Sequence, residues 1–237
     1  MNFDHLIWPT DGWGYMPPQE DVFAPFHYIR DNYNPKNVLE IGFCWGHSTT
    51  YQLEIYKDAS MVCVGPIAED NLSKEVPDSK QRQTQIDKMY QVYGDRFKHL
   101  AGRTHVVQYD LLESYVDYFD VCLIDGYHKS WAVEVDSILC QDLNIPIILV
   151  DNWDQDEVQS TVKKFTDYET IEVFTYNQTW KGTDYQNEMA ICRLTYHYSE
   201  IVMTTKHTRP CLSRRGMSLW RCCICYQRKR TQRQQHL

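Results

Sequence analysis

Residues 38–48 read VLEIGFCWGHS, and this stretch decides the fold. The apolar run that ends at Ile41 predicts a buried strand, and residues 48–57 favour a helix. Gly42 and Gly46 lie in the turn between them, where glycine permits a sharp bend and a close approach of a ligand to the backbone. The first turn of the helix would offer unpaired N–H groups to an anionic group. The stretch therefore predicts a strand, a glycine turn and a helix that together face a ligand.

Two interpretations of this turn stay open at the level of sequence. Its Gly-x-x-x-Gly spacing differs from the Gly-x-Gly-x-x-Gly of dinucleotide-binding proteins, which disfavours an NAD-type oxidoreductase. The same residues also fit a plain strand-to-helix connection in which Ser48 is the N-cap of the helix.

Six further apolar segments resemble buried strands: residues 61–64, 97–100, 121–124, 145–150, 170–176 and 189–194. Apolar residues at helical spacing lie between several of them: Ile86, Met89, Tyr90 and Tyr93, then Trp131, Val135, Ile138, Leu139 and Leu143, then Val158, Val162 and Phe165. Strands that are apolar at every position are buried on both faces, and the helices between them supply the covering layers. The sequence therefore predicts an α/β fold with a Rossmann-like, mostly parallel seven-stranded sheet and helices on both faces. The last two strands, joined by the polar loop 177–187, would form an antiparallel closing hairpin.

Composition divides the chain into three parts. Residues 1–35 form an aromatic-rich arm or lid, residues 36–199 the α/β domain, and residues 200–237 a basic Cys/Arg-rich tail. The tail holds nine Lys+Arg and one acid, so the net charge of −8 combines a tail of +8 with a remainder of −16. The nine cysteines are an odd number in a chain too long to need disulfides, which favours reduced thiols. No apolar window of about 18 residues exists, so we expect no membrane span. The expectation of reduced thiols favours a cytoplasmic protein.

Polar residues follow two of the predicted strands where each one ends. Asp125 and His128 come after the strand 121–124, and Asp151 and Asn152 come after the strand 145–150. Three oxygen ligands from neighbouring strand ends suit an octahedral Mg²⁺ ion. An alternative is that Asp151 or Asn152 caps the helix that begins near residue 157. The imidazole of His128 suits a general base near neutral pH, with Lys129 as the less favoured candidate.

These motifs, in this order, resemble those of class I S-adenosylmethionine-dependent methyltransferases. The residues that carry the resemblance are VLEIG with GHS (38–42 and 46–48), YGDRF (93–97), the segment 120–128 and the segment 148–152. The branch with an Ile-Asp-Gly-x-His motif, related to the metal-dependent sugar and catechol O-methyltransferases, is the most similar. The match runs from about residue 36 to residue 194.

The resemblance implies roles for individual residues. Glu40, Gly42, Gly46 and Ser48 match the loop that contacts the methionine moiety and the cofactor backbone. Asp125 matches an acid that ligates the metal and borders the cofactor, and Asp151 and Asn152 match the paired ligands after the fifth strand. His128 matches the position of the general base.

The sequence also departs from the pattern of this family. The second strand usually ends in an acid that binds the ribose hydroxyls, whereas here Gly65-Pro66 follows Val64 and the nearest candidate acid is Glu69. An acid that often lies beside the adenine after the third strand is replaced by Arg103. Either Glu69 substitutes through a longer loop, or the cofactor binds weakly, or the pocket is degenerate.

The resemblance implies a methyltransferase that uses S-adenosylmethionine and Mg²⁺ to methylate a hydroxyl of a small, sugar-like molecule by direct displacement. Trp8, Trp13 and Tyr15 would either stack on the substrate or simply pack. The alternative is a non-catalytic Rossmann-like binding module whose tail contacts nucleic acid or a partner protein. Zinc binding by the tail cysteines is disfavoured, because their spacing lacks separated Cys-x-x-Cys pairs.

Overall fold

The computed structural model describes residue 16 and residues 18–67, 78–180 and 183–195. The order of the elements is given by their bounds: α1 (Glu20–Tyr33), β1 (Asn37–Ile41), α2 (His47–Ile55), β2 (Ser60–Gly65), α3 (Ser79–Tyr93), a 3-10 turn η1 (Gly94–Arg96), β3 (Phe97–Ala101), α4 (Thr104–Ser114), β4 (Val121–Ile124), α5 (Ser130–Asp142), β5 (Ile147–Val150), α6 (Asp156–Phe165), β6 (Tyr168–Trp180) and β7 (Thr183–Leu194). The predicted tail, 200–237, lies outside the described residues, as do residues 1–15 and 17 of the predicted arm.

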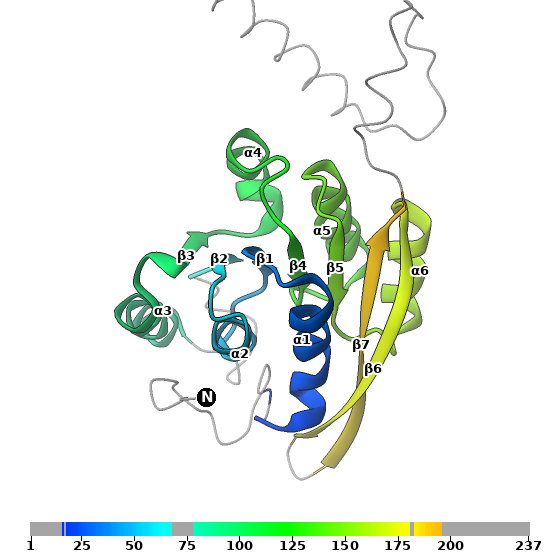
Figure 1. Cartoon of the computed structure of the whole chain (residues 1–237), viewed down its shortest axis with the longest axis horizontal. Coiled ribbons are helices and arrows are strands. Elements are labelled where there is room, and N and C mark those ends of the chain that lie inside the picture. The colour runs from blue at the N-terminus through cyan, green and yellow to red at the C-terminus, as the bar shows by residue number, and fades with distance from the viewer. Residues whose placement is uncertain (1–15, 17, 68–77, 181–182, 196–237) are drawn as a thin grey trace, which may run out of the picture. The chain divides into compact units, whose positions relative to one another are not determined.

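The strands form one sheet of seven strands in the order β3-β2-β1-β4-β5-β7-β6 (Figure 1). The first five are parallel, and β7 pairs antiparallel with both β5 and β6. This confirms the predicted mostly parallel sheet with an antiparallel closing hairpin. The strand order reverses between β1 and β4, and open parallel sheets bind ligands at such a switch point, outside the carboxyl ends of the strands.

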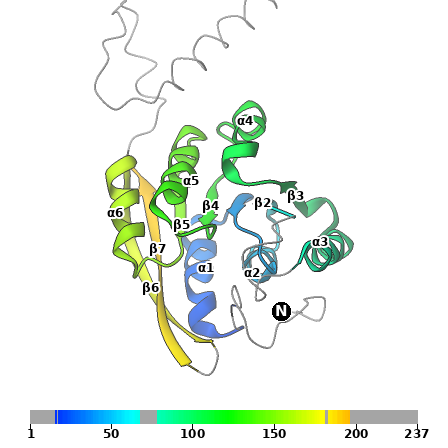
Figure 2. The same ribbon diagram turned by 180° about the vertical axis from the view of Figure 1, so that it is seen from behind.

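Helices cover both faces of the sheet, as the uniformly apolar strands require (Figures 1 and 2). One core layer joins Val38, Met61 and Leu123 to α1, α2 and α3. The other joins Leu39, Val62 and Ile124 to α4, α5 and α6. Successive residues of one strand therefore enter opposite cores, which is the alternation that a pleated strand imposes.

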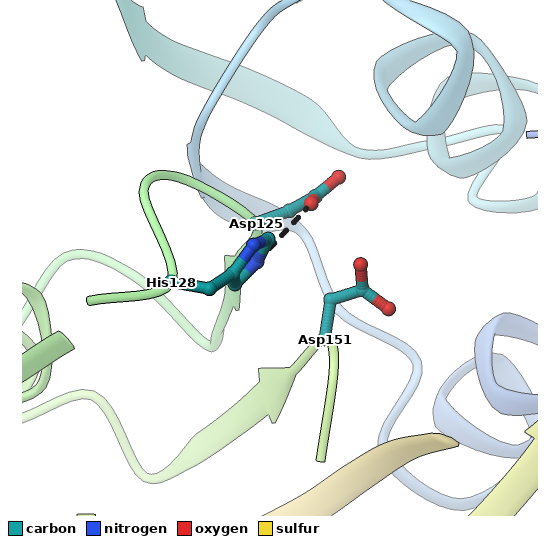
Figure 3. A group of neighbouring side chains, drawn as sticks. All are labelled: Asp125, His128 and Asp151. Atoms are coloured by element: carbon teal, nitrogen blue, oxygen red, sulfur yellow. Dashed lines mark ion pairs between the residues drawn. The ribbon is translucent and has the colours of Figure 1, made fainter. Parts of the chain in front are cut away.

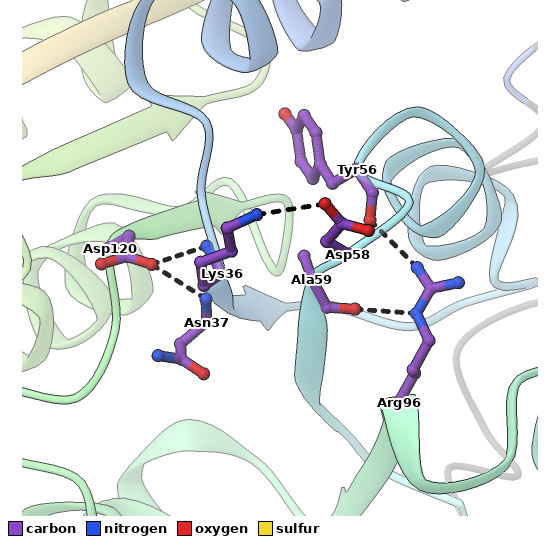
Figure 4. Close-up of polar contacts among 7 residues, drawn as sticks. All are labelled: Lys36, Asn37, Tyr56, Asp58, Ala59, Arg96 and Asp120. Atoms are coloured by element: carbon purple, nitrogen blue, oxygen red, sulfur yellow. Dashed lines mark hydrogen bonds and ion pairs between the residues drawn. The ribbon is translucent and has the colours of Figure 1, made fainter.

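The amino ends of β1 and β2 are held by polar contacts to the backbone (Figure 4). A carboxylate oxygen of Asp120 accepts the backbone N–H groups of Lys36 at 2.7 Å and Asn37 at 2.9 Å. The guanidinium of Arg96 donates to the carbonyl oxygens of Leu53, Tyr56 and Ala59 at 2.7, 3.0 and 2.9 Å. The chain is thereby fixed where it enters the sheet.

Three features differ from the expectations drawn from sequence. The helix α4 had no counterpart among the predicted elements. The predicted loop 177–187 is mostly strand, because β6 and β7 pair with each other as far as Trp180 and Thr183. Along α5, Trp131 was placed on the buried face but is 51% exposed, whereas Asp136 is buried.

The five cysteines of the described residues form no disulfide. Among the described helices, none is long and apolar enough to cross a membrane.

Candidate functional site

The turn after β1 requires glycine at its first position. Gly42 has a φ of +113°, and a Cβ atom there would lie 1.9 Å from the backbone oxygen of Asp125. Its N–H donates to the carbonyl oxygen of Val64 at 2.8 Å. The backbones that follow β1 and β4 therefore approach each other more closely than any side chain would allow.

The structure decides between the interpretations of Ser48. Gly46, with a φ of +74°, is the N-cap residue of α2, so the assignment of Ser48 as the N-cap is wrong. Ser48 lies inside the first turn, and its hydroxyl donates to a carboxylate oxygen of Glu40.

Glu40 is fully buried in β1, beneath this turn. Its second carboxylate oxygen has no hydrogen-bond partner among the described residues. Burial raises the pKa of Glu40 to about 7, against the opposing effect of the Ser48 hydrogen bond. A carboxyl group that titrates near neutral pH thus lies under the glycine turn.

Asp125, His128 and Asp151 come together at the carboxyl ends of β4 and β5 (Figure 3). One potential ligand atom from each of the three lies within 4.8 Å of the other two. Nε2 of His128 is 3.8 Å from a carboxylate oxygen of Asp125 and has no hydrogen-bond partner within the described part of the chain. Two carboxylates and an imidazole at this spacing fit a divalent cation, because a cation would relieve their mutual repulsion and use the free imidazole nitrogen.

The electrostatics of this cluster also fit a cation. Although 24% of its side chain is exposed, burial raises the pKa of Asp125 well above its usual range, and the negative charges of Asp151 and Glu40 raise it further. Burial lowers the pKa of His128, opposed by the charges of Asp151 and Asp154. At neutral pH the imidazole is therefore neutral and able to accept a proton or bind a metal.

Asp151 is held by a tyrosine from the closing hairpin. The hydroxyl of Tyr176, in β6, donates to a carboxylate oxygen of Asp151 at 2.6 Å. Burial and the charge of Asp151 raise the pKa of Tyr176, so its hydroxyl stays a donor. The alternative that Asp151 or Asn152 caps α6 is wrong, because Gln155 is the N-cap residue. Asn152 is half-buried and has a φ of +54°.

A cavity of about 490 Å³ lies beside this cluster. Its walls come from the segments that follow four parallel strands and from α5, with one residue of α3: residues 41–44, 64–66, 102–105 and 125–127, Trp131, Ala132, Val135, Asp136 and Arg82. The volume lies within the range of small-molecule and cofactor sites. The cavity therefore occupies the place where an open parallel sheet binds its ligand.

The structure separates the predicted site residues into groups. Gly42 and Asp125 line the cavity, whereas Glu40, Gly46 and Ser48 lie within and beneath the turn that forms its wall. Lys129 is exposed at the N-cap of α5. Glu69, like Trp8, Trp13 and Tyr15, lies outside the described residues.

Reasoning from sequence missed Arg82, Asp136 and Tyr176. Burial raises the pKa of Asp136 to about 7, opposed by a hydrogen bond from Thr104. Arg82 precedes Ile86 by four residues and Met89 by seven, so helical spacing already placed it on the buried face of α3. Asp136 precedes Leu139 by three residues and carries a similar signal. Nothing local to Tyr176 marks it as a contact of Asp151.

No family model matches the sequence, and no curated protein matches it. Solved structures do match the fold. An O-methyltransferase from Bacillus cereus in complex with SAH is 15% identical, with 78% of this chain and 84% of that chain covered and a TM-score of 0.53. The O-methyltransferase TomG from Streptomyces achromogenes, involved in tomaymycin synthesis and in complex with SAM, is 14% identical, with 76% and 82% covered and a TM-score of 0.53.

A putative O-methyltransferase from Klebsiella pneumoniae is also similar, with 14% identity, 76% and 82% of the two chains covered and a TM-score of 0.52. At these identities the similarity shows the fold. The chain thus has the Rossmann-like fold of class I S-adenosylmethionine-dependent methyltransferases, which confirms at the level of fold the resemblance seen in its sequence.

Proposed function

We propose that this protein is an S-adenosylmethionine-dependent methyltransferase that methylates a hydroxyl group of a small, sugar-like molecule with the help of a divalent cation. The observation that carries the proposal is the cavity at the β1/β4 switch point, directly beside the group Asp125, His128 and Asp151. Two structures of the same fold are O-methyltransferases in complex with SAM or SAH, and a third is named as a putative O-methyltransferase.

Each residue has a role in this proposal. The turn that carries Gly42 would hold the cofactor backbone, with Glu40 and Ser48 supporting it from below. Asp125 and Asp151, with Asn152, would hold Mg²⁺ or Mn²⁺. A cation in that place supplies positive charge that favours the ionised form of a substrate hydroxyl. His128, whose pKa is lowered by burial, would accept the proton of the substrate hydroxyl, while the cofactor would supply the methyl group and leave as S-adenosylhomocysteine.

Calorimetric titration with S-adenosylhomocysteine tests the cofactor assignment. We expect saturable 1:1 binding to the full chain, and we expect Trp131→Ala, in the cavity wall, to weaken it. An exposed change outside the cavity, Asp110→Asn, should leave it unchanged. If ~1 mM ligand gives no heat of binding, the binding free energy is weaker than about 4 kcal/mol. That result would rule out the proposed cofactor.

Removal and return of metal tests the cation site separately. We expect EDTA treatment to abolish methyl transfer and Mg²⁺ or Mn²⁺ to restore it. Asp125→Asn and Asp151→Asn should weaken Mn²⁺ binding, measured by the paramagnetic broadening of water relaxation, by roughly 10- to 100-fold. Full activity in the presence of EDTA would remove the cation from the mechanism and leave the methyl transfer itself in place.

His128 lies close enough to both aspartates to be a metal ligand instead of the base, and one variant distinguishes these roles. If it is the base, His128→Gln lowers kcat by about 100-fold or more and leaves Mn²⁺ affinity unchanged. If it is a ligand, the same variant loses Mn²⁺ affinity. Lys129→Met serves as the matched control, because Lys129 is exposed at the start of α5 and should not matter.

A second candidate function is a binding module without catalysis. The absence of an acid at the end of β2, with Arg82 and Arg103 in the cavity wall, favours it. Its basic tail would contact nucleic acid, with an affinity that falls steeply with salt. Salt-dependent nucleic-acid binding that disappears on deletion of residues 200–237, together with no binding of S-adenosylhomocysteine, would favour this second function.

A further inference from the structure

The edge of the cavity formed by the end of β2 has no room for an acidic side chain. A Cβ atom on Gly65 would lie 2.7 Å from the Cβ of Phe43. The next residue, Pro66, offers a carbonyl oxygen but no N–H group. The carboxylate that in related folds binds a ribose from this strand end is therefore excluded sterically at position 65.

An arginine from another element reaches the same place. Arg82, in α3, is only 4% exposed and lines the cavity. Its Nη1 donates to the carbonyl oxygen of Pro66 at 3.0 Å, and its Nε is buried and has no hydrogen-bond partner among residues 18–67, 78–180 and 183–195. Within the described residues no carboxylate forms an ion pair with Arg82. A buried guanidinium donor without a partner is costly, so a ligand that supplies an acceptor would stabilise it.

We propose that Arg82 and the Pro66 carbonyl together recognise the two ribose hydroxyls of the adenosyl cofactor. A hydroxyl both donates one hydrogen bond and accepts others. A carboxylate binds a vicinal diol by accepting from both hydroxyls. Here one hydroxyl donates to the free lone pair of the Pro66 carbonyl, and the other accepts from Nε of Arg82. The inference rests on the proposed function, because the diol belongs to the cofactor.

This arrangement has a consequence that a carboxylate would not share. The guanidinium keeps its proton throughout the pH range of the folded protein. Recognition of the hydroxyls by Arg82 is therefore independent of pH, whereas recognition by an acid such as Glu69 is lost when that acid is protonated, near pH ~4.

The test is calorimetry on the full chain with S-adenosylhomocysteine and its 2′-deoxy and 3′-deoxy analogues. We expect the wild type to prefer the complete ribose by about tenfold over at least one analogue. In Arg82→Met, which keeps the apolar stem, that preference should disappear. Lys80→Met, an exposed cation on the same helix, should keep it. Each preference is a ratio of two affinities measured on the same protein. A general destabilisation of the fold would lower both affinities and leave the ratio unchanged.

Retention of the full hydroxyl preference by Arg82→Met would overturn the inference and leave Arg82 as a clamp between α3 and β2. If the variant does not fold, the wild type decides through its pH dependence. A preference that stays constant from about pH 8 to pH 4 supports arginine, and one that vanishes toward pH 4 overturns it. Failure of S-adenosylhomocysteine to bind at all would instead remove the proposed function.

Discussion

The two ends of β4 each carry an aspartate, and the two are in opposite situations. Asp120, before the strand, accepts two backbone N–H groups, at 2.7 and 2.9 Å (Figure 4). Asp125, just after the strand, accepts no backbone N–H among the described residues and lies beside Asp151 and His128 (Figure 3). These two carboxyl groups are five residues apart in sequence. Asp120 pairs with the backbone around it, whereas the surroundings of Asp125 raise its pKa.

The same contrast extends along both edges of the sheet. At the amino edge, Arg96 satisfies three carbonyl oxygens at once. At the carboxyl edge, Glu40, Arg82 and His128 each have a buried polar atom for which the described residues supply no hydrogen-bond partner. Buried polar groups are normally paired, and because Arg82 lines the cavity, a ligand there could supply the partner that its nitrogen lacks. One edge is built for stability and the other for binding.

The largest effect should come from the closest backbone approach at the carboxyl edge. Gly42→Ala forces a Cβ into the backbone after β4, and we expect a loss of about 4 kcal/mol or more in the free energy of unfolding, or no folded protein. Gly94→Ala is the control at the amino edge, where φ is also positive but no atom lies within 4 Å. It should cost only about 1–3 kcal/mol of backbone strain. If urea unfolding gave equal losses of free energy for the two variants, the close backbone contact at Gly42 would not be the cause of the destabilisation.

Glu40→Gln should reveal how much the buried charge of Glu40 lowers the free energy of unfolding. The pKa of Glu40 is raised from 4.5 to about 7, so its contribution to stability is fully present below about pH 4.5 and is lost as pH rises through 7. The variant lacks this loss, so its advantage should grow with pH to about 3 kcal/mol. Thermal unfolding across this range measures it, with the exposed Glu172→Gln as the control. An advantage that does not change with pH contradicts the raised pKa.

Asp120→Ala tests the amino edge. Two backbone N–H groups lose a charged acceptor at a partly exposed site, and we expect a loss of about 2 kcal/mol with no change in S-adenosylhomocysteine affinity. Asp110→Ala, exposed in α4, should stay within about 0.5 kcal/mol of the wild type. A change in ligand affinity for Asp120→Ala would mean that the two edges are not independent.

Asp125→Asn should have the smallest effect on stability. Burial raises the pKa of Asp125 well above its usual range, so the surroundings disfavour the charged form, and a neutral amide of the same shape should replace it with a change within about 0.5 kcal/mol. Mn²⁺ should raise the Tm of the wild type, and we expect this increase to disappear in Asp125→Asn. A large loss of stability without metal would place Asp125 in the same structural role as Asp120.

Much of the fold could be predicted because the central strands β4 and β5 are apolar at every position. The run 121–124 was identified with its observed bounds, since uniform apolarity indicates burial on both faces. The loop 177–187 was predicted wrongly because its polar residues are stabilised by pairing with each other across the hairpin, as in the pair of Asn177 with Gln186. Such pairing leaves no local signal in a strand that is exposed on both sides.

The candidate site could be predicted in part for a similar reason. Asp125, His128 and Asp151 follow apolar strands, and parallel strands bring their carboxyl ends to one edge. Arg82 and Tyr176 come from elements that reach the site through tertiary packing, and no spacing along the chain specifies which atoms they meet. Arg82 was not identified from the sequence, although helical spacing places it on the buried face of α3, and the role proposed for it depends on the steric exclusion of a side chain at Gly65.

The contact from Tyr176 to Asp151 also sets an order in time. Residues 125–151 leave the ribosome before Tyr176 does, so a nascent chain has all three candidate ligands before it has the hydroxyl that orients one of them. The next residue, Asn177, donates its backbone N–H to Asp21 at the start of α1 at 2.9 Å. Tyr176 and Asn177, in the late-synthesised closing hairpin, therefore contact both the site and the first helix. An unfinished chain would hold the acids of the site without their final support.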